Sequence, residues 1–221
     1  MKLPILAATA FVAVITSANA AVIISEIDPT GSSTSTYAAD WFELTNTGTT
    51  AVGITGWKMD DNSNSFALAV PLRNVTSIAP GQSVVFVEGT ATGTTDATID
   101  ANFETAWFGS NVPFGFVIGN YGGSGVGLSS TADAVNIFDS TGTLVTRLDF
   151  GTSTAGVTFD NAAGLNNVTL STLSVAGTNG AFVSPTNETG SPGVIPEPAS
   201  CGLVLSGLAA MGLIRRRRTN I

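Results

Sequence analysis

The chemistry open to this sequence rests on carboxylates, because the chain contains no histidine and its single cysteine is Cys201. Ser-His-Asp and Cys-His hydrolases, His-ligated zinc sites and an intrachain disulfide are therefore excluded. A carboxylate hydrolase needs two facing acids about 5–10 Å apart, and Glu26, Glu43 and Glu88 are the candidates. Nothing in the sequence pairs them across a cleft. We predict no catalytic site and no enzyme, and we expect these carboxylates to face water or to cap turns.

A second chemical possibility is a calcium site in the run Asp60-Asp61-Asn62-Ser63-Asn64. Asp60, Asn62 and Asn64 offer oxygen ligands at alternating positions, as at the start of an EF-hand loop. The sixth position is Ser65 instead of Gly and the twelfth is Pro71 instead of Glu, so an EF-hand is excluded. A looser Ca²⁺ site and a solvated turn remain as alternatives. We predict no other metal or cofactor.

Charge is distributed very unevenly along the chain. Between residues 21 and 193 there are fifteen acidic residues but only three basic ones, Lys58, Arg73 and Arg147, which gives this part a net charge of −12. Such a field repels nucleic acid phosphates and predicts no nucleic-acid partner. An anionic polysaccharide would bind only with the help of a divalent cation.

The N-terminal twenty residues have the pattern of a secretory signal peptide. Lys2 is followed by an apolar stretch over residues 3–15 and by Ala18-Asn19-Ala20, the small-x-small step at which signal peptidase cuts. The alternative, a buried N-terminal helix, is disfavoured because a strand-like pattern starts at Ala21. We therefore predict a signal peptide over residues 1–20, with Ala18 and Ala20 directing the cut, and export of the mature chain.

The C-terminal residues form a second sorting signal in three parts. An extended Pro196-Glu197-Pro198 peptide precedes an uncharged apolar stretch over residues 199–214, and the arginines that follow are Arg215, Arg216, Arg217 and Arg218. As a helix, the apolar stretch would span about 24 Å, slightly less than a hydrocarbon core of about 30 Å. The positive-inside rule would hold the arginines in the cytoplasm and the body outside, which predicts a C-terminal transmembrane helix.

Together these three parts, over residues 194–221, resemble the PEP-CTERM sorting signal of Gram-negative bacteria. The resemblance implies processing by an exosortase, through an inner-membrane intermediate, and release to the cell surface or the extracellular space. An ordinary single-pass anchor is the alternative interpretation of the same residues.

Between the two signals, short strand patterns recur, separated by Gly, Asn, Asp, Ser and Thr. One stretch, residues 101–108, has helical spacing. Trp41, Trp57 and Trp107 are expected in the core. The expected strands cover residues 22–27, 41–46, 54–59, 66–70, 82–88, 115–118, 134–138, 144–150, 156–159 and 169–175. This pattern predicts an all-β fold, an antiparallel β-sandwich with one short helix.

Three elements of the body resemble the lamin-tail domain. They are Ile23-Ile24-Ser25-Glu26-Ile27, the run from Asp40 to Asn46 that contains Trp-Phe-Glu-Leu-Thr-Asn, and Gly56-Trp57 with its flanking residues. Gly190-Ser191-Pro192-Gly193 is similar to the Thr-Pro-Gly ending of that family, with Ser in place of Thr. The resemblance implies an immunoglobulin-like β-sandwich over residues 21–193.

These observations predict a non-enzymatic surface or extracellular-matrix protein, sorted by an exosortase, with a structural, adhesive or exopolysaccharide-associated role. A carbohydrate- or calcium-dependent binding module is the alternative. The partners expected are signal peptidase and exosortase as processing enzymes, the membrane before processing, and extracellular polysaccharide.

Overall fold

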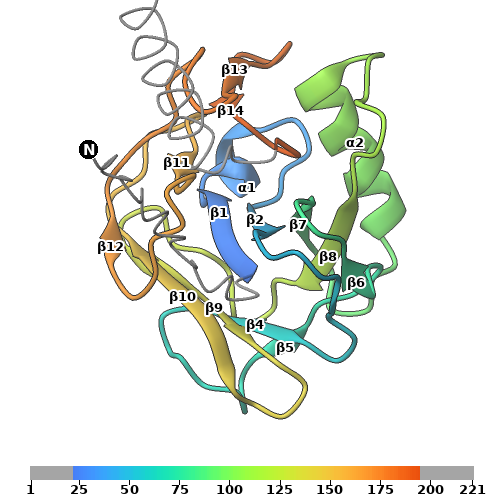
Figure 1. The fold of residues 1–221 in the computed structure, drawn as a ribbon. Helices are drawn as coiled ribbons and strands as arrows, with labels where there is room; N and C mark the ends of the chain where they lie inside the picture. The colour runs from blue at the N-terminus through green and yellow to red at the C-terminus, as the bar shows by residue number, and fades with distance from the viewer. Residues whose placement is uncertain (1–21, 195–221) are drawn as a thin grey trace, which may run out of the picture.

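The computed structural model describes residues 22–194, which form two five-stranded β-sheets packed face to face (Figure 1). In spatial order the first sheet contains β11 (Phe159–Asp160), β1 (Val22–Asp28), β2 (Trp41–Asn46), β7 (Ser83–Gly89) and β8 (Ile118–Gly122). The second contains β12 (Thr169–Leu170), β10 (Leu144–Phe150), β9 (Asp133–Phe138), β4 (Lys58–Asp60) and β5 (Val70–Pro71). Two smaller pairs are β3 (Val52–Gly53) with β6 (Ser77–Ile78) and β13 (Phe182–Val183) with β14 (Thr189–Gly190).

The core between the two sheets follows from the alternation along β1 and β2. Phe42 and Leu44 of β2 point toward the second sheet with Ile24 of β1, and all three are fully buried. Because neighbouring side chains on a strand point to opposite faces, Trp41, Glu43 and Thr45 project from the outer face of the first sheet. β2 thus places Glu43 beneath the layer that covers the outer face of the first sheet.

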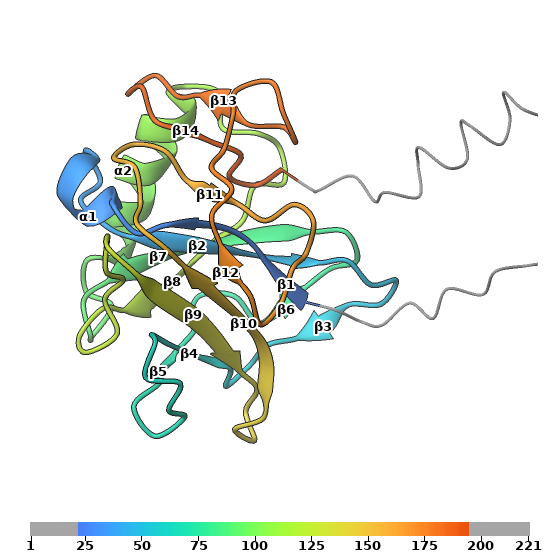
Figure 2. The same ribbon diagram turned by 90° about the vertical axis from the view of Figure 1, so that its left-hand side faces the viewer.

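A third layer covers the outer face of the first sheet. It consists of α2 (Asp96–Phe108) and the C-terminal segment with β13 and β14, which lie above the sheet in Figure 2. Trp41, Phe103, Trp107 and Phe182 form an aromatic cluster there, with ring centroids 5.5–6.0 Å apart in mostly edge-to-face contacts. The indole N–H groups of Trp41 and Trp107 both donate to the Tyr37 hydroxyl, at 3.1 and 3.3 Å.

All three tryptophans are core residues, as predicted. Trp41 and Trp107 are at most 1% exposed, and Trp57, 8% exposed, belongs to the core between the sheets. The aromatic cluster therefore fixes α2 to the first sheet and leaves neither of its indoles available as a ligand platform.

Several element bounds differ from the prediction where glycine or turn residues interrupt the alternation. Residues 54–57 form a turn, with the Trp57 amide donating to the Ile54 carbonyl at 3.0 Å and Gly56 at φ +80°, so β4 begins only at Lys58. Residues 66–69 also lie in a turn, and β8 starts at Ile118, later than expected. The pairs β7–β8 and β10–β12 run parallel, which makes both sheets mixed.

The helical content exceeds the prediction. α2 begins at Asp96, five residues before the expected start, and a one-turn helix, α1 (Gly31–Thr34), follows β1. Within residues 22–194 no helix is long and apolar enough to span a membrane. The predicted transmembrane helix over residues 199–214 lies outside the described residues.

Candidate functional site

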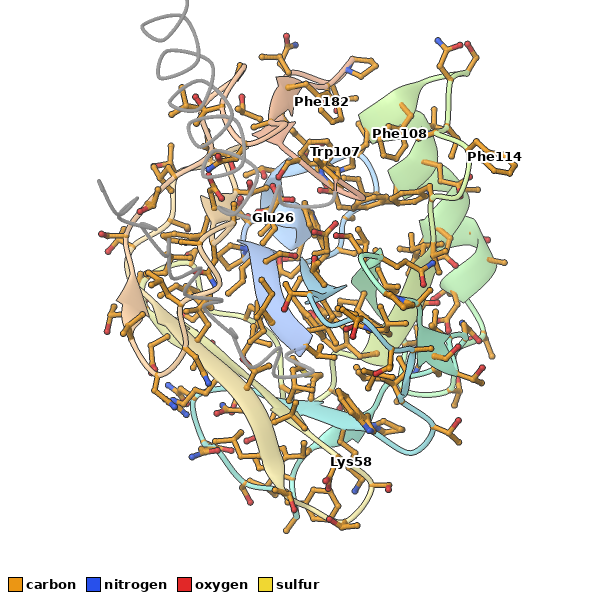
Figure 3. All side chains as sticks on the ribbon, viewed as in Figure 1. Glu26, Lys58, Trp107, Phe108, Phe114 and Phe182 are labelled. Carbon is orange, nitrogen blue, oxygen red and sulfur yellow. The ribbon has the colours of Figure 1, made fainter. Side chains whose placement is uncertain are left out.

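Glu26 and Glu43 face each other on the outer side of the first sheet. They are directly opposite in the β1–β2 register, and each is only 1% exposed. Figure 3 shows Glu26 inside the molecule, below Trp107. A β-bulge between Ile24 and Glu26 shifts the register here, and the extra residue, Ser25, donates its hydroxyl to Glu43 Oε1 at 2.6 Å. Two like charges placed opposite each other on neighbouring strands are destabilising, so this pair needs other partners.

The partners come from the far end of the folded chain, from a segment that we call the C-terminal strap, Gly190–Val194. The Ser191 amide donates to Glu26 Oε1 at 2.7 Å, and its hydroxyl donates to Oε2 at 3.2 Å. The Gly193 amide donates to Glu43 Oε2 at 2.5 Å. Glu26 also accepts from the Thr158 hydroxyl at 2.5 Å. The two carboxyl groups thus bind successive backbone donors of one segment and hold it across the sheet.

Each residue of Gly190-Ser191-Pro192-Gly193 suits this arrangement. A Cβ at Gly190 would lie 2.7 Å from Glu26 Oε1 and 2.8 Å from the Trp107 ring, closer than any side chain permits. Pro192 has no amide hydrogen, so no donor is left unpaired between the two glutamates. Gly193 has φ +77°, and a Cβ there would lie 2.6 Å from the Phe116 ring. The strap sequence is therefore constrained by the carboxyl pair and by the aromatic cluster together.

Burial raises the pKa of both carboxyl groups. The pKa of Glu43 rises from its ordinary 4.5 to about 7, mainly because burial disfavours the charged form. The pKa of Glu26 rises well above 4.5, first through burial and then through the nearby Glu43 carboxylate. Hydrogen bonds from Thr158 and Ser191 act in the opposite direction without offsetting burial. Both carboxyl groups therefore hold their protons to a higher pH than exposed glutamates do.

The expectation that these carboxylates face water or cap turns is wrong for Glu26 and Glu43. Both are buried, and the donors that make burial tolerable lie about 150 residues away in the chain, at Ser191 and Gly193. Glu88 is not part of the pair: it lies on β7 against Gly123, with its pKa raised by burial. The sequence analysis did not predict the strap. The feature that could have indicated it is the Gly-Ser-Pro-Gly run, in a chain that has two glutamates in predicted strands and few basic residues to pair with them.

Comparison with known families adds two matches. The family model of the Lamin Tail Domain matches residues 15–152, and that of the PEP-CTERM protein-sorting motif matches residues 194–218. The chain belongs to the lamin tail domain family. Comparisons with curated proteins and with solved structures give no match. The fold is accordingly an immunoglobulin-like β-sandwich, and both matched families are of non-catalytic kinds.

The sorting motif determines the route of this lamin tail domain protein. It marks the chain for processing by an exosortase, through a membrane-anchored intermediate, and for export to the cell surface or the extracellular space. The predicted motif residues Pro196, Glu197, Pro198 and Arg215–Arg218 lie outside the described residues. The signal-peptide residues Ala18 and Ala20 do so as well.

The lamin tail domain match ends at residue 152, but the sandwich continues. β11 pairs with β1 and β12 pairs with β10, so residues after 152 supply an edge strand to each sheet. The strap then closes the outer face and ends at Val194, whose carbonyl accepts from the Ser83 hydroxyl at 3.0 Å. The folded part of the chain thus reaches to within two residues of Pro196.

The three candidate calcium ligands differ in their surroundings. Asp60 is fully buried, and its Oδ2 accepts from the Ser63 hydroxyl and the Ser65 amide, both at 2.6 Å, which organises the loop after β4. Asn62 and Asn64 are exposed. Asp60 Oδ1 is buried without a hydrogen-bond partner. Among residues 22–194, no group of three or more His, Cys, Asp or Glu side chains is arranged to hold a metal ion.

Proposed function

We propose that this lamin tail domain protein is a non-enzymatic component of the cell surface or extracellular matrix, with a structural, adhesive or exopolysaccharide-associated role. The observation that carries the proposal is the closure of the strap over the carboxyl pair. Glu26 and Glu43 are the acids best placed to act together, and every oxygen of the pair is occupied by a donor of the protein itself. In this proposal the two carboxyl groups act as hydrogen-bond acceptors that hold the strap on the first sheet, and they take no part in a reaction.

In this proposal, signal peptidase removes residues 1–20 and the exosortase acts at the Pro196-Glu197-Pro198 peptide. The strap lies before that peptide, and its hydrogen bonds to Glu26, Glu43 and Ser83 all join residues of the body. Removal of the tail would then release a body that keeps its closed third layer. The sorting signal and the folded body are thus separate parts of the chain, which suits a protein that reaches its destination folded.

The proposal predicts that Glu197→Ala abolishes removal of the tail and retains the protein in the membrane fraction, with no change in the melting temperature of the body. Glu104→Ala on α2 is the matched control, since it also removes one carboxylate but lies outside the motif. Mass spectrometry of the mature protein measures both ends. Secretion of the Glu197→Ala variant with a trimmed C-terminus would contradict the proposal, as would a wild-type matrix fraction that contains only the uncut chain.

A calcium-dependent binding module is a second candidate, favoured by one observation, the buried and unpartnered Asp60 Oδ1. A cation held there by Asp60 and loop oxygens would stabilise the folded state by mass action. This candidate predicts a higher melting temperature in millimolar CaCl₂ than in EDTA, with the increase lost in Asp60→Asn. Equal melting temperatures in Ca²⁺ and EDTA would eliminate it, and a glycan array with and without Ca²⁺ would then test carbohydrate binding alone.

A further inference from the structure

The surface around the last described residue carries no charge. We call it the exit surface and define it by residues 79–83, 112–116, 175–183 and 193–194. Pro80, Pro113, Phe114, Phe116 and Gly193 line a hollow of about 320 Å³ there, and Gly180 lies against the Val194 side chain. The β6–β7 turn and the end of the described chain point to the same side of the molecule in Figure 2. None of the fifteen acidic residues of the body falls in these segments.

Large apolar side chains are exposed on this same surface. Phe114 is 108% exposed and projects outward at the edge of the molecule in Figure 3, and Val112 beside it is 40% exposed. Val175 and Val183 are 61% and 55% exposed. Exposed apolar residues are unremarkable when scattered singly, but a group of them on an uncharged surface of a strongly acidic protein marks a contact site.

The length of chain beyond Val194 indicates what this surface contacts. Only residues 195–198 separate Val194 from the apolar stretch that starts at Ala199. Five steps of extended chain span at most about 18 Å, and the headgroup layer alone takes up roughly 5–8 Å of that distance. In the membrane-anchored intermediate the exit surface is therefore held at most about 10–13 Å from the lipid headgroups.

We propose that the exit surface docks on the lipid bilayer, with Phe114 and Val112 inserted at the interface, while the chain is anchored by its tail. The contact is apolar and not electrostatic, because Lys58, Arg73 and Arg147 all lie outside the exit surface. The acidic residues on other faces disfavour those faces from approaching anionic lipid. Docking orients the body and fixes the Pro196-Glu197-Pro198 peptide at the membrane surface, where a membrane protease acts.

Fluorescence of the full-length, uncut chain in phosphatidylcholine vesicles tests this docking without any exosortase. An environment-sensitive probe is attached at position 114 in Phe114→Cys/Cys201→Ala. The control is Leu68→Cys/Cys201→Ala: Leu68 is 63% exposed in the β4–β5 connection, which lies far from β13 and β14 in Figure 2. A third sample carries the probe on Cys201 of the otherwise native chain and reports insertion of the tail.

We expect a blue shift and quenching by lipids brominated near the headgroup for the probe at position 114, and neither for the probe at position 68. Quenching at position 201 without quenching at position 114 would overturn the docking while leaving the anchor intact. Equal quenching at 114 and 68 would overturn it as well, because the contact would then have no preferred face. Because no processing occurs in these vesicles, failure here is distinguishable from failure of the proposed function.

Discussion

The folded body will lose stability as the pH rises from 5 to 8, opposite to the behaviour of a protein whose acids form salt bridges. Glu43 has a folded-state pKa raised from 4.5 to about 7, so the folded state binds a proton that the unfolded state releases. The stabilisation is complete below pH 4.5 and is lost as the pH rises through 7. At 1.36 kcal/mol per pKa unit, Glu43 alone accounts for about 3 kcal/mol.

Other buried acids change the stability in the same direction. Burial raises the pKa of Asp28, Asp40 and Glu188, and it raises the pKa of Glu26 well above its ordinary value. Among residues 22–194, the partly exposed Asp139 is the one acid whose pKa is lowered, through hydrogen bonds from Thr141 and Thr143. The pH slope of stability is therefore expected to be negative over the whole range between 5 and 8.

Urea denaturation at pH 5, 6, 7 and 8 measures this slope, and Glu43→Gln is the matched control. The Gln side chain retains an acceptor for the Gly193 amide but cannot titrate, so its slope should be clearly smaller than that of the wild type. A wild-type stability that stays constant or rises up to pH 8 would contradict the assignment of a raised pKa to the pair. If the free energy of unfolding of Glu43→Gln depends on pH as steeply as that of the wild type, a group other than Glu43 is responsible for the pH dependence.

How far the sequence predicts the fold depends on whether its signal is local. The patterns in residues 41–46 and 144–150 give the bounds of β2 and β10 to the residue, because strand propensity and alternation are properties of adjacent positions. The segment 54–57 contains equally apolar residues but turns at Gly56, whose positive φ no hydropathy pattern reveals. The two-residue strands β13 and β14 are too short to have a pattern of their own, and β13 packs on Trp107 of α2 through Phe182, a contact between residues distant in the sequence.

The same distinction applies to the site. The prediction that the strand carboxylates face water or cap turns fails for Glu26, because its donors are not local in sequence. The Ser191 amide that binds it lies 165 residues away, and no local pattern connects that residue to β1. The sorting signal, in contrast, can be predicted from the sequence, because its charge, its length and its apolar character all belong to one continuous segment.

Removing one carboxyl group of the pair will detach the strap and cost the body a large part of its stability. In Glu26→Ala the Ser191 amide and hydroxyl lose their acceptor in a buried site, and the side-chain volume is left empty. Unsatisfied buried donors cost about 1–3 kcal/mol each and the cavity adds to this, so we expect a loss of about 3 kcal/mol or more. Glu26→Gln keeps an oxygen acceptor in a side chain of nearly the same shape, so its stability should stay within about 1 kcal/mol of wild type.

Hydrogen exchange at pH 6 distinguishes loss of the strap from general destabilisation. The strap is held at two points with a proline between them, and Gly193 is bonded to Glu43 rather than to Glu26. If the strap binds as a unit, Glu26→Ala will accelerate exchange of both the Ser191 and the Gly193 amides beyond the change at β9 and β10, which lie in the other sheet. Faster exchange at Ser191 with Gly193 unchanged would mean that the two glutamates hold the chain independently. Uniform acceleration across both sheets would mean that the carboxyl pair supports the sandwich as a whole and has no special hold on the segment that leads to the sorting signal.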